Sequence, residues 1–107
     1  MPPPRIMYIE HKSGGDVGPA RIGRVTFSKS GRSIYYDGKS FRSLKGSGIQ
    51  GNYYDVATRE EYWISGPHRD GADSLYGYRP TPIDADAREE YWTLIRKRPS
   101  RKDQATT

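Results

Sequence analysis

The dipeptide Asp37-Gly38 constrains the fold of this chain more than any other short feature. An Asp-Gly pair between two strand-like segments is a strong signal for a β-hairpin, because both turn residues must adopt a positive φ. Such segments lie on either side of it, at residues 33–36 and 39–44, and an alternating apolar and polar segment at residues 21–28 precedes a glycine turn. The sequence therefore predicts a three-stranded antiparallel meander.

Turn-forming residues also divide the rest of the chain into short segments. Glycine accounts for 12 of the 107 residues and proline for 8. Between these turns, residues 5–10, 52–56 and 61–65 have the apolar and aromatic content of further strands. We therefore expect a single, mainly β domain of the α+β class over residues 5–98. Its five or six short strands would form a closed or nearly closed, barrel-like antiparallel sheet.

One helix is expected at the end of this domain, over about residues 85–98. Asp84 and Asp86 are candidate N-caps, because a carboxylate there accepts hydrogen bonds from the first free backbone N–H groups. An apolar stripe at helical spacing would pack on the sheet; its members are Ala87, Tyr91, Leu94 and Ile95. Residues 1–4 and 99–107 are predicted to be flexible, solvated tails.

Several classes of protein are excluded by composition. With no cysteine, the chain has no disulfides, thiolate metal sites or cysteine nucleophiles. No apolar run approaches the roughly 18 residues of a membrane-spanning helix, and the first residues lack the apolar core of a secretory signal. The glycines of residues 46–51 match the letters of a phosphate-binding G-x-G-x-x-G loop. Such a loop must lead into a helix, whereas a strand is expected after these glycines. We expect a cytoplasmic protein without metal, small-molecule cofactor or membrane contact.

Charge is distributed unevenly along the chain, whose formal net charge is +5. Residues 18–50 carry seven basic residues and one acid, whereas residues 51–95 carry four basic residues and nine acids. Residues 96–107 are basic again. This segregation gives one face of the molecule the potential to attract an acidic partner. The alternative is that these charges are solvated and serve solubility.

Paired aromatic residues accompany the basic segment. Neighbouring residues of a strand point to opposite faces, so Tyr35 lies on the outer surface if Tyr36 joins the core. Outward rings and cations on a small barrel bind single-stranded nucleic acid, because rings stack on bases and cations neutralise phosphates. We therefore hypothesise a non-enzymatic module for single-stranded RNA or DNA. Its candidate contacts are Arg24, Arg32, Tyr35, Lys39, Arg42 and Lys45. Alternatively, such tyrosines merely cover the sheet.

Two other functions remain open. One is a protein-binding surface on the turn-rich connection at residues 66–82 and the strand before it. Aromatic side chains there could anchor a partner, because such residues are enriched at interfaces. The candidates are Trp63, His68, Tyr76 and Tyr78. A small ribonuclease could exchange protons between His11 and His68, with Lys12 steadying a phosphate.

Three segments of the chain resemble a group of short bacterial proteins with no established activity. They are G-P-A-R-I-G-R-V-T-F-S-K-S-G-R at 18–32, G-N-Y-Y-D-V at 51–56 and E-E-Y-W-I-S-G at 60–66. Some members of this group bear the name 1-deoxy-D-xylulose-5-phosphate synthase. That enzyme holds magnesium and thiamine diphosphate through a G-D-G motif, from which Gly15-Asp16-Val17 departs. The resemblance, over about residues 5–98, implies a bacterial, cytosolic single domain and adds no catalytic residue.

Overall fold

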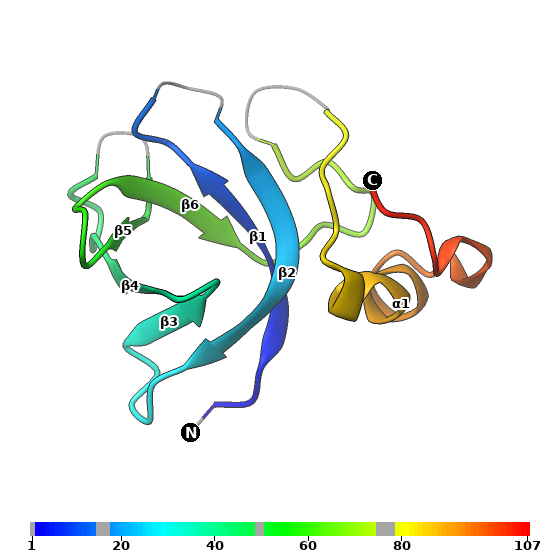
Figure 1. The fold of residues 1–107 in the computed structure, drawn as a ribbon, viewed down its shortest axis with the longest axis horizontal. Helices are drawn as coiled ribbons and strands as arrows, with labels where there is room; N and C mark the ends of the chain where they lie inside the picture. Colours follow the sequence, from blue (N-terminus) through cyan, green and yellow to red (C-terminus); the bar gives the residue numbers. More distant parts are fainter. Residues whose placement is uncertain (1, 15–17, 49–50, 75–78) are drawn as a thin grey trace.

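Six antiparallel strands close into a barrel in the computed structural model, which describes residues 2–14, 18–48, 51–74 and 79–107. Each strand pairs with the next along the chain, and β1 closes the barrel by pairing with both β2 and β6 (Figure 1). The strands are β1 (Arg5–His11), β2 (Ala20–Phe27), β3 (Ser33–Tyr36), β4 (Lys39–Ser43), β5 (Tyr53–Asp55) and β6 (Glu61–Ser65). The predicted fold, a small antiparallel barrel followed by a short helix, is confirmed.

The hairpin between β3 and β4 turns at the Asp37-Gly38 pair, as predicted. Both residues have positive φ, 51° at Asp37 and 74° at Gly38, which is the two-residue geometry that matches the twist of the flanking strands. Before this turn the chain alternates as expected. Tyr36 packs against the cluster inside the barrel, whereas Tyr35 is 41% exposed on the outside.

The core has two parts because β1 is buried on both faces. Met7 and Ile9 point into the barrel, while Ile6 and Tyr8 point outward into a second cluster. The inner cluster contains Met7, Ile9, Val25, Ile34, Phe41 and Ile64. The outer cluster contains Ile6, Tyr8, Ile22, Ile83, Ala87, Tyr91 and Trp92, so the C-terminal helical segment covers β1 and β2 from outside (Figure 1).

The helical segment is less regular than predicted. A 3₁₀ turn (Ala85–Ala87), one turn of α-helix (α1, Arg88–Glu90) and a π turn (Tyr91–Ile95) follow one another without a side-chain cap. In a π turn each N–H bonds to the carbonyl five residues earlier, as Arg96 does to Tyr91. The wider turn brings Trp92 into the core and leaves Leu94 62% exposed, which corrects the predicted stripe. No helix in the described ranges is long and apolar enough to cross a membrane.

The side chains of residues 99–106 are exposed, as expected of a solvated tail, but the backbone there is bound to the rest of the fold. After a short 3₁₀ turn (Pro99–Arg101), the chain returns to the segment that precedes the helical turns. Ile83 N donates to Ala105 O at 2.7 Å, and Trp92 Nε1 donates to Gln104 O at 2.9 Å. The tail contributes backbone carbonyl groups to both bonds, so its polar side chains gave no sign of them. The folded unit therefore extends beyond residue 98.

Candidate nucleic-acid interface

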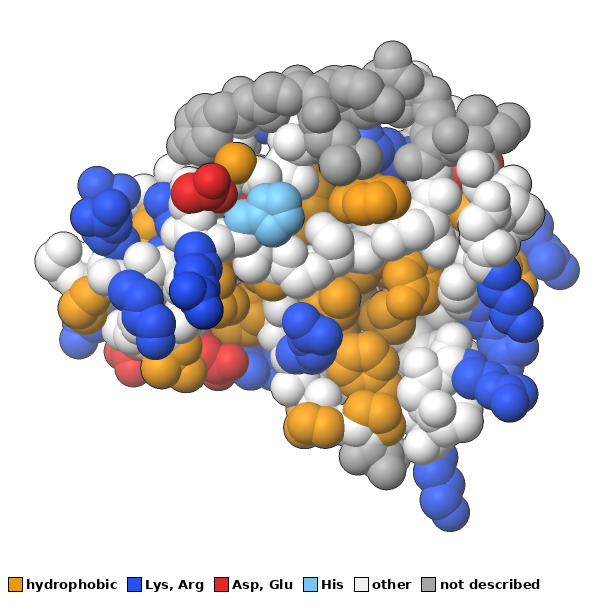
Figure 2. Space-filling model, turned by 180° about the vertical axis from the view of Figure 1, so that it is seen from behind, with side chains coloured by type: hydrophobic (Ala, Val, Ile, Leu, Met, Phe, Trp, Pro, Cys, Tyr) orange, Lys and Arg blue, Asp and Glu red, His pale blue; other side chains and the backbone are white. Residues whose placement is uncertain are grey.

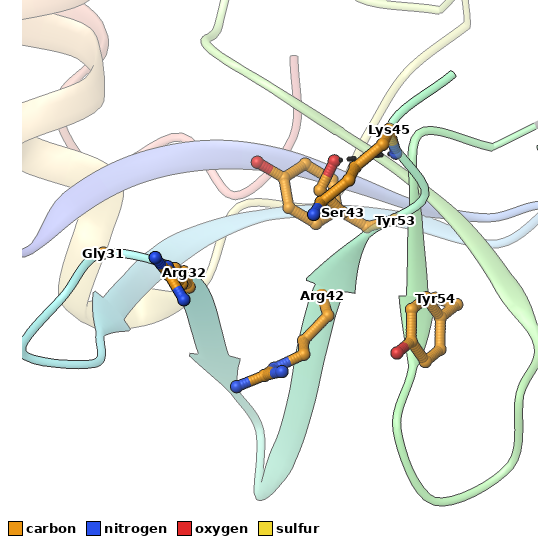
Figure 3. Close-up of a pocket in the computed structure, with 7 residues that line it drawn as sticks. All are labelled: Gly31, Arg32, Arg42, Ser43, Lys45, Tyr53 and Tyr54. Carbon is orange, nitrogen blue, oxygen red and sulfur yellow. Dashed lines mark hydrogen bonds between the residues drawn. The ribbon is translucent and has the colours of Figure 1, made fainter. Parts of the chain in front are cut away.

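Three of the predicted nucleic-acid contacts line one groove at an end of the barrel. Arg32 lies in the turn between β2 and β3, Arg42 on β4, and Lys45 just after β4. The groove has a volume of about 480 Å³, and we call it the basic groove. Its lining is Gly31, Arg32, Arg42, Ser43, Lys45, Tyr53 and Tyr54 (Figure 3).

The register of the sheet brings an arginine and a tyrosine together on the outer surface. Arg42 on β4 lies opposite Ser33 on β3 and opposite Tyr54 on β5. Arg42 Nε donates to Ser33 Oγ at 3.3 Å, which fixes one side of the guanidinium group and leaves its other N–H groups for a ligand. Figure 3 shows the Arg42 and Tyr54 side chains extending from neighbouring strands.

Tyrosine rings and a further cation complete this surface. Tyr53 packs against the inner core cluster and also lines the basic groove. Tyr54 is half-buried, and the Arg59 guanidinium carbon lies 5.5 Å from its ring centroid, which is within the range of a cation–π contact. The basic groove therefore combines cations with aromatic rings.

The cations of the basic groove are free of carboxylates. Arg32, Arg42 and Lys45 are all exposed, and none forms an ion pair with an acidic side chain in the described part of the chain. Figure 2 shows Lys and Arg side chains along the edge of the barrel that lies far from the helical segment. Most of the acidic side chains visible in this view lie on the other half of the molecule. This surface therefore keeps its positive potential for an external anion.

Arg24, in contrast, is placed outside the basic groove. It points outward from β2 as its position in the strand predicts, but the helical segment covers this face. Arg24 Nη2 lies 3.1 Å from Glu90 Oε1 and donates to Asp86 O at 3.2 Å. The charge of Arg24 is therefore paired with an acidic side chain of the same protein.

Tyr35 and Lys39 also lie apart from the groove lining. Tyr35 is on the outer face of β3, opposite Ser40 and Thr26. Lys39 lies beside the hairpin at the other end of the barrel, with its Nζ 3.9 Å from Asp37 Oδ2. The structure therefore brings three of the six predicted contacts together.

Tyr53 and Tyr54 were not among the predicted contacts, although a signal for them was present. The sequence predicts strands at residues 39–44 and 52–56 in succession. Antiparallel strands that follow one another usually pair, and this pairing places Tyr54 next to Arg42.

The residues of the alternative protein-binding surface are only partly described. Trp63 is partly buried and packs against the outer core cluster. The His68 ring Nδ1 lies 2.6 Å from Ala72 O, within its own loop. Tyr76 and Tyr78 fall outside the described residues. Trp63 is therefore used at least in part to stabilise the fold.

The residues proposed for a ribonuclease have separate partners. His11 Nε2 lies 3.2 Å from Glu60 Oε2, whereas His68 lies in the loop already described. Lys12 is 1% exposed, with its Nζ 3.0 Å from Glu10 Oε2, so it does not present a charge at the surface.

A buried charged cluster surrounds Glu10, whose side chain is fully buried on the outer face of β1. Tyr8 Oη donates to Glu10 Oε1 at 2.7 Å, and Lys12 and Arg79 lie 3.0 and 3.1 Å from Oε2. Burial and the hydrogen bond to Glu10 raise the pKa of Tyr8 to about 12. Burial opposes ionisation of Glu10, but the hydrogen bonds from Tyr8 and Gly18 and the charge of Lys12 prevail, so its pKa lies below the ordinary value.

A second charged cluster, which is partly exposed, joins the barrel to the segment before the helical turns. The carboxylate of Asp84 accepts hydrogen bonds from Arg21 Nε, at 2.6 Å, and from the Tyr36 hydroxyl. Burial and this bond raise the pKa of Tyr36 above its ordinary value. Asp84 was predicted as an N-cap, but its side chain is used in this tertiary contact instead.

Other chemistries find little support in the geometry. Within the described residues, no group of three or more His, Asp or Glu side chains is arranged to hold a metal ion. Strand β5, and not a helix, follows the glycines of residues 46–51, so they lack the helix N-terminus that such a phosphate-binding loop requires.

No family model, curated protein or solved structure matches the chain.

Proposed function

We propose that this protein binds single-stranded nucleic acid through the basic groove. The observation that carries the proposal is that Arg32, Arg42 and Lys45 converge on one concave surface with Tyr53 and Tyr54, without a carboxylate partner among the described residues.

The two residue types have complementary roles in such binding. Arginine presents a planar fork of N–H donors that fits phosphate oxygens, and the lysine ammonium adds a point charge. A tyrosine ring can stack on an unpaired base of any identity, which is worth about 1–3 kcal/mol per base. Because a base must be unpaired to stack in this way, the groove favours single strands over duplexes.

Tyr35 can extend this surface along the outside of the barrel. Its ring points outward from β3, as Arg42 and Tyr54 do from β4 and β5. A strand that leaves the basic groove across β3 would meet this ring next. We therefore assign Tyr35 a secondary stacking role.

The test is fluorescence anisotropy with labelled, mixed-sequence single-stranded RNA and its DNA counterpart at low salt. Wild-type protein should bind both, and the triple variant Arg32→Ala/Arg42→Ala/Lys45→Ala should lose most of the affinity. A matched control removes three exposed cations from the other side of the molecule, in the variant Lys97→Ala/Arg98→Ala/Lys102→Ala. Equal losses in the two variants would mean that net charge, not the basic groove, attracts the nucleic acid.

Two further outcomes would favour the alternative functions. If neither RNA nor DNA bound at low salt, the proposal would be wrong, and the protein-binding surface around Trp63 would be tested next. Shortening of the labelled RNA during the titration, seen on a denaturing gel, would favour the ribonuclease. In that case His11→Ala and His68→Ala should each abolish cleavage.

A further inference from the structure

The barrel has a second opening, at the end opposite the basic groove, where β1 ends and the β3–β4 hairpin turns. A cavity of about 150 Å³ lies there, and we call it the barrel mouth. Its lining includes Ile9, His11, Arg21, Tyr36, Phe41 and Tyr62. The mouths of β-barrels are frequent sites for small molecules, which bind in concave, mostly apolar pockets with a few polar groups.

The floor of the barrel mouth is apolar and aromatic. Ile9 and Phe41 are buried members of the inner core cluster. The ring of Tyr62 lies edge-on to its two neighbours, with centroids 4.7 Å from Phe41 and 5.0 Å from His11. A flat ring entering this space would therefore meet aromatic side chains.

The polar groups at the rim are engaged with one another in pairs. Arg21 Nε lies 2.6 Å from Asp84 Oδ1, and His11 Nε2 lies 3.2 Å from Glu60 Oε2. Lys39 Nζ lies 3.9 Å from Asp37 Oδ2. A charged ligand would have to compete with one of these pairs, whereas a neutral ligand with polar edges could bind beside all of them.

We propose that the barrel mouth binds one neutral, single-ring heteroaromatic molecule, of which a pyrimidine base is the representative. The size of the cavity supports a single ring, because an apolar cavity of about 150 Å³ is known to hold one benzene molecule. The aromatic floor would contact the face of the ring, and the rim would meet its hydrogen-bonding edge. This site does not depend on the basic groove, which lies at the other end of the barrel.

The test is a titration with free uracil, followed by proton NMR of the two histidine rings. The chain contains only His11 and His68, so one histidine reports on the barrel mouth and the other on a loop that does not line it. Uracil should shift the His11 signals to saturation and leave those of His68 in place. Adenine, which has two fused rings, and orotate, which is uracil with a carboxylate, should have weaker effects.

A pair of variants locates the binding. Tyr62→Leu removes a ring from the floor and should weaken uracil binding about tenfold, while Tyr62→Phe retains the ring and should bind as the wild type does. If Tyr62→Leu does not fold, the histidine signals of the wild-type protein still decide the matter. Unmoved His11 signals, or equal shifts with uracil, adenine and orotate, would overturn the proposal.

The groove variant Arg32→Ala/Arg42→Ala/Lys45→Ala separates this proposal from the proposed function. It should lose single-stranded nucleic acid and retain uracil. Loss of both ligands from this folded variant would contradict the independence of the two sites.

Discussion

Basic side chains on two sides of the same barrel differ in whether they form ion pairs with acidic side chains. On the side that faces the helical segment, Arg24 is bound to Glu90 of that segment and Arg21 to Asp84 just before it. Lys12 and Arg79 are bound to the buried Glu10. In the basic groove, Arg32, Arg42 and Lys45 have no acidic partner among the described residues.

This difference separates stability from binding. A cation bound to a partly buried carboxylate stabilises the contact between two parts of the chain, and removing either partner leaves the other uncompensated. An exposed, unpaired cation contributes little to stability but keeps its charge for an external anion. Substitutions on the paired side should therefore lower the stability of the protein, and substitutions in the groove should change only its binding.

The largest effect is expected from Glu10→Gln. The variant removes the buried carboxylate charge that lies 3.0 Å from the Lys12 ammonium, whose side chain is 1% exposed, and we expect a loss of about 3–5 kcal/mol from the free energy of unfolding. Urea denaturation of both proteins measures this. The matched control is Glu60→Gln, whose carboxylate is 46% exposed and whose loss should cost about 0.5 kcal/mol or less. Similar losses in the two variants would contradict the structural role of the buried cluster.

The same cluster predicts how stability depends on pH. The pKa of Glu10 is lower in the folded protein than its ordinary value of 4.5, so the folded state binds this proton less readily than the unfolded state. The stabilisation is complete above about pH 4.5 and is lost as the pH falls through the pKa of the folded state. Thermal melting between pH 7 and pH 3 should show a shallower decline for Glu10→Gln than for wild type. Parallel declines would assign the acid sensitivity to other carboxylates.

A smaller loss is expected from Asp84→Ala. This change removes the acceptor for Arg21 and Tyr36, and because Asp84 is 22% exposed we expect about 1–2 kcal/mol. Tyr36 should then titrate at lower pH, since the neighbouring carboxylate no longer opposes ionisation of its hydroxyl. Urea denaturation and spectrophotometric titration of the tyrosines check the two effects. Unchanged stability would mean that this contact does not hold the helical segment.

The smallest and most specific effect comes from making one substitution on each side. Arg24→Gln should cost up to about 1 kcal/mol of stability and leave nucleic-acid binding unchanged. Arg42→Gln should leave stability unchanged and reduce affinity by a similar free energy, because one phosphate contact is lost. Melting curves and anisotropy of both variants form the comparison. If Arg24→Gln weakened binding as much as Arg42→Gln, the distinction between the two sides would fail.

Local sequence patterns predicted much of the barrel because turn residues and strand alternation are encoded locally. The Asp37-Gly38 pair adopts positive φ at both residues, and alternation along β3 correctly placed Tyr35 outside and Tyr36 inside. These features depend only on neighbouring residues, so a single sequence contains them.

Contacts between distant parts of the chain were not predictable in the same way. Alternation correctly turned Arg24 outward from β2, but no local pattern indicated that Asp86 and Glu90 would cover this face. Asp84 has the sequence position of an N-cap, yet its carboxylate is used by Arg21 and Tyr36. The three cations of the basic groove were among the predicted contacts, whereas its tyrosines, Tyr53 and Tyr54, were not. The division of the predicted cations into paired and unpaired ones required the tertiary structure.

The salt dependence of nucleic-acid affinity tests the central claim most directly. For a single strand, a plot of the log binding constant against the log salt concentration has a slope of about −0.7 per phosphate neutralised. Three groove cations therefore predict a slope of about −2. The variant Arg32→Ala/Arg42→Ala/Lys45→Ala should have lower affinity and a slope near zero. A wild-type slope that persists in this variant would show that other cations contact the phosphates, and the claim that the basic groove binds nucleic acid would be wrong.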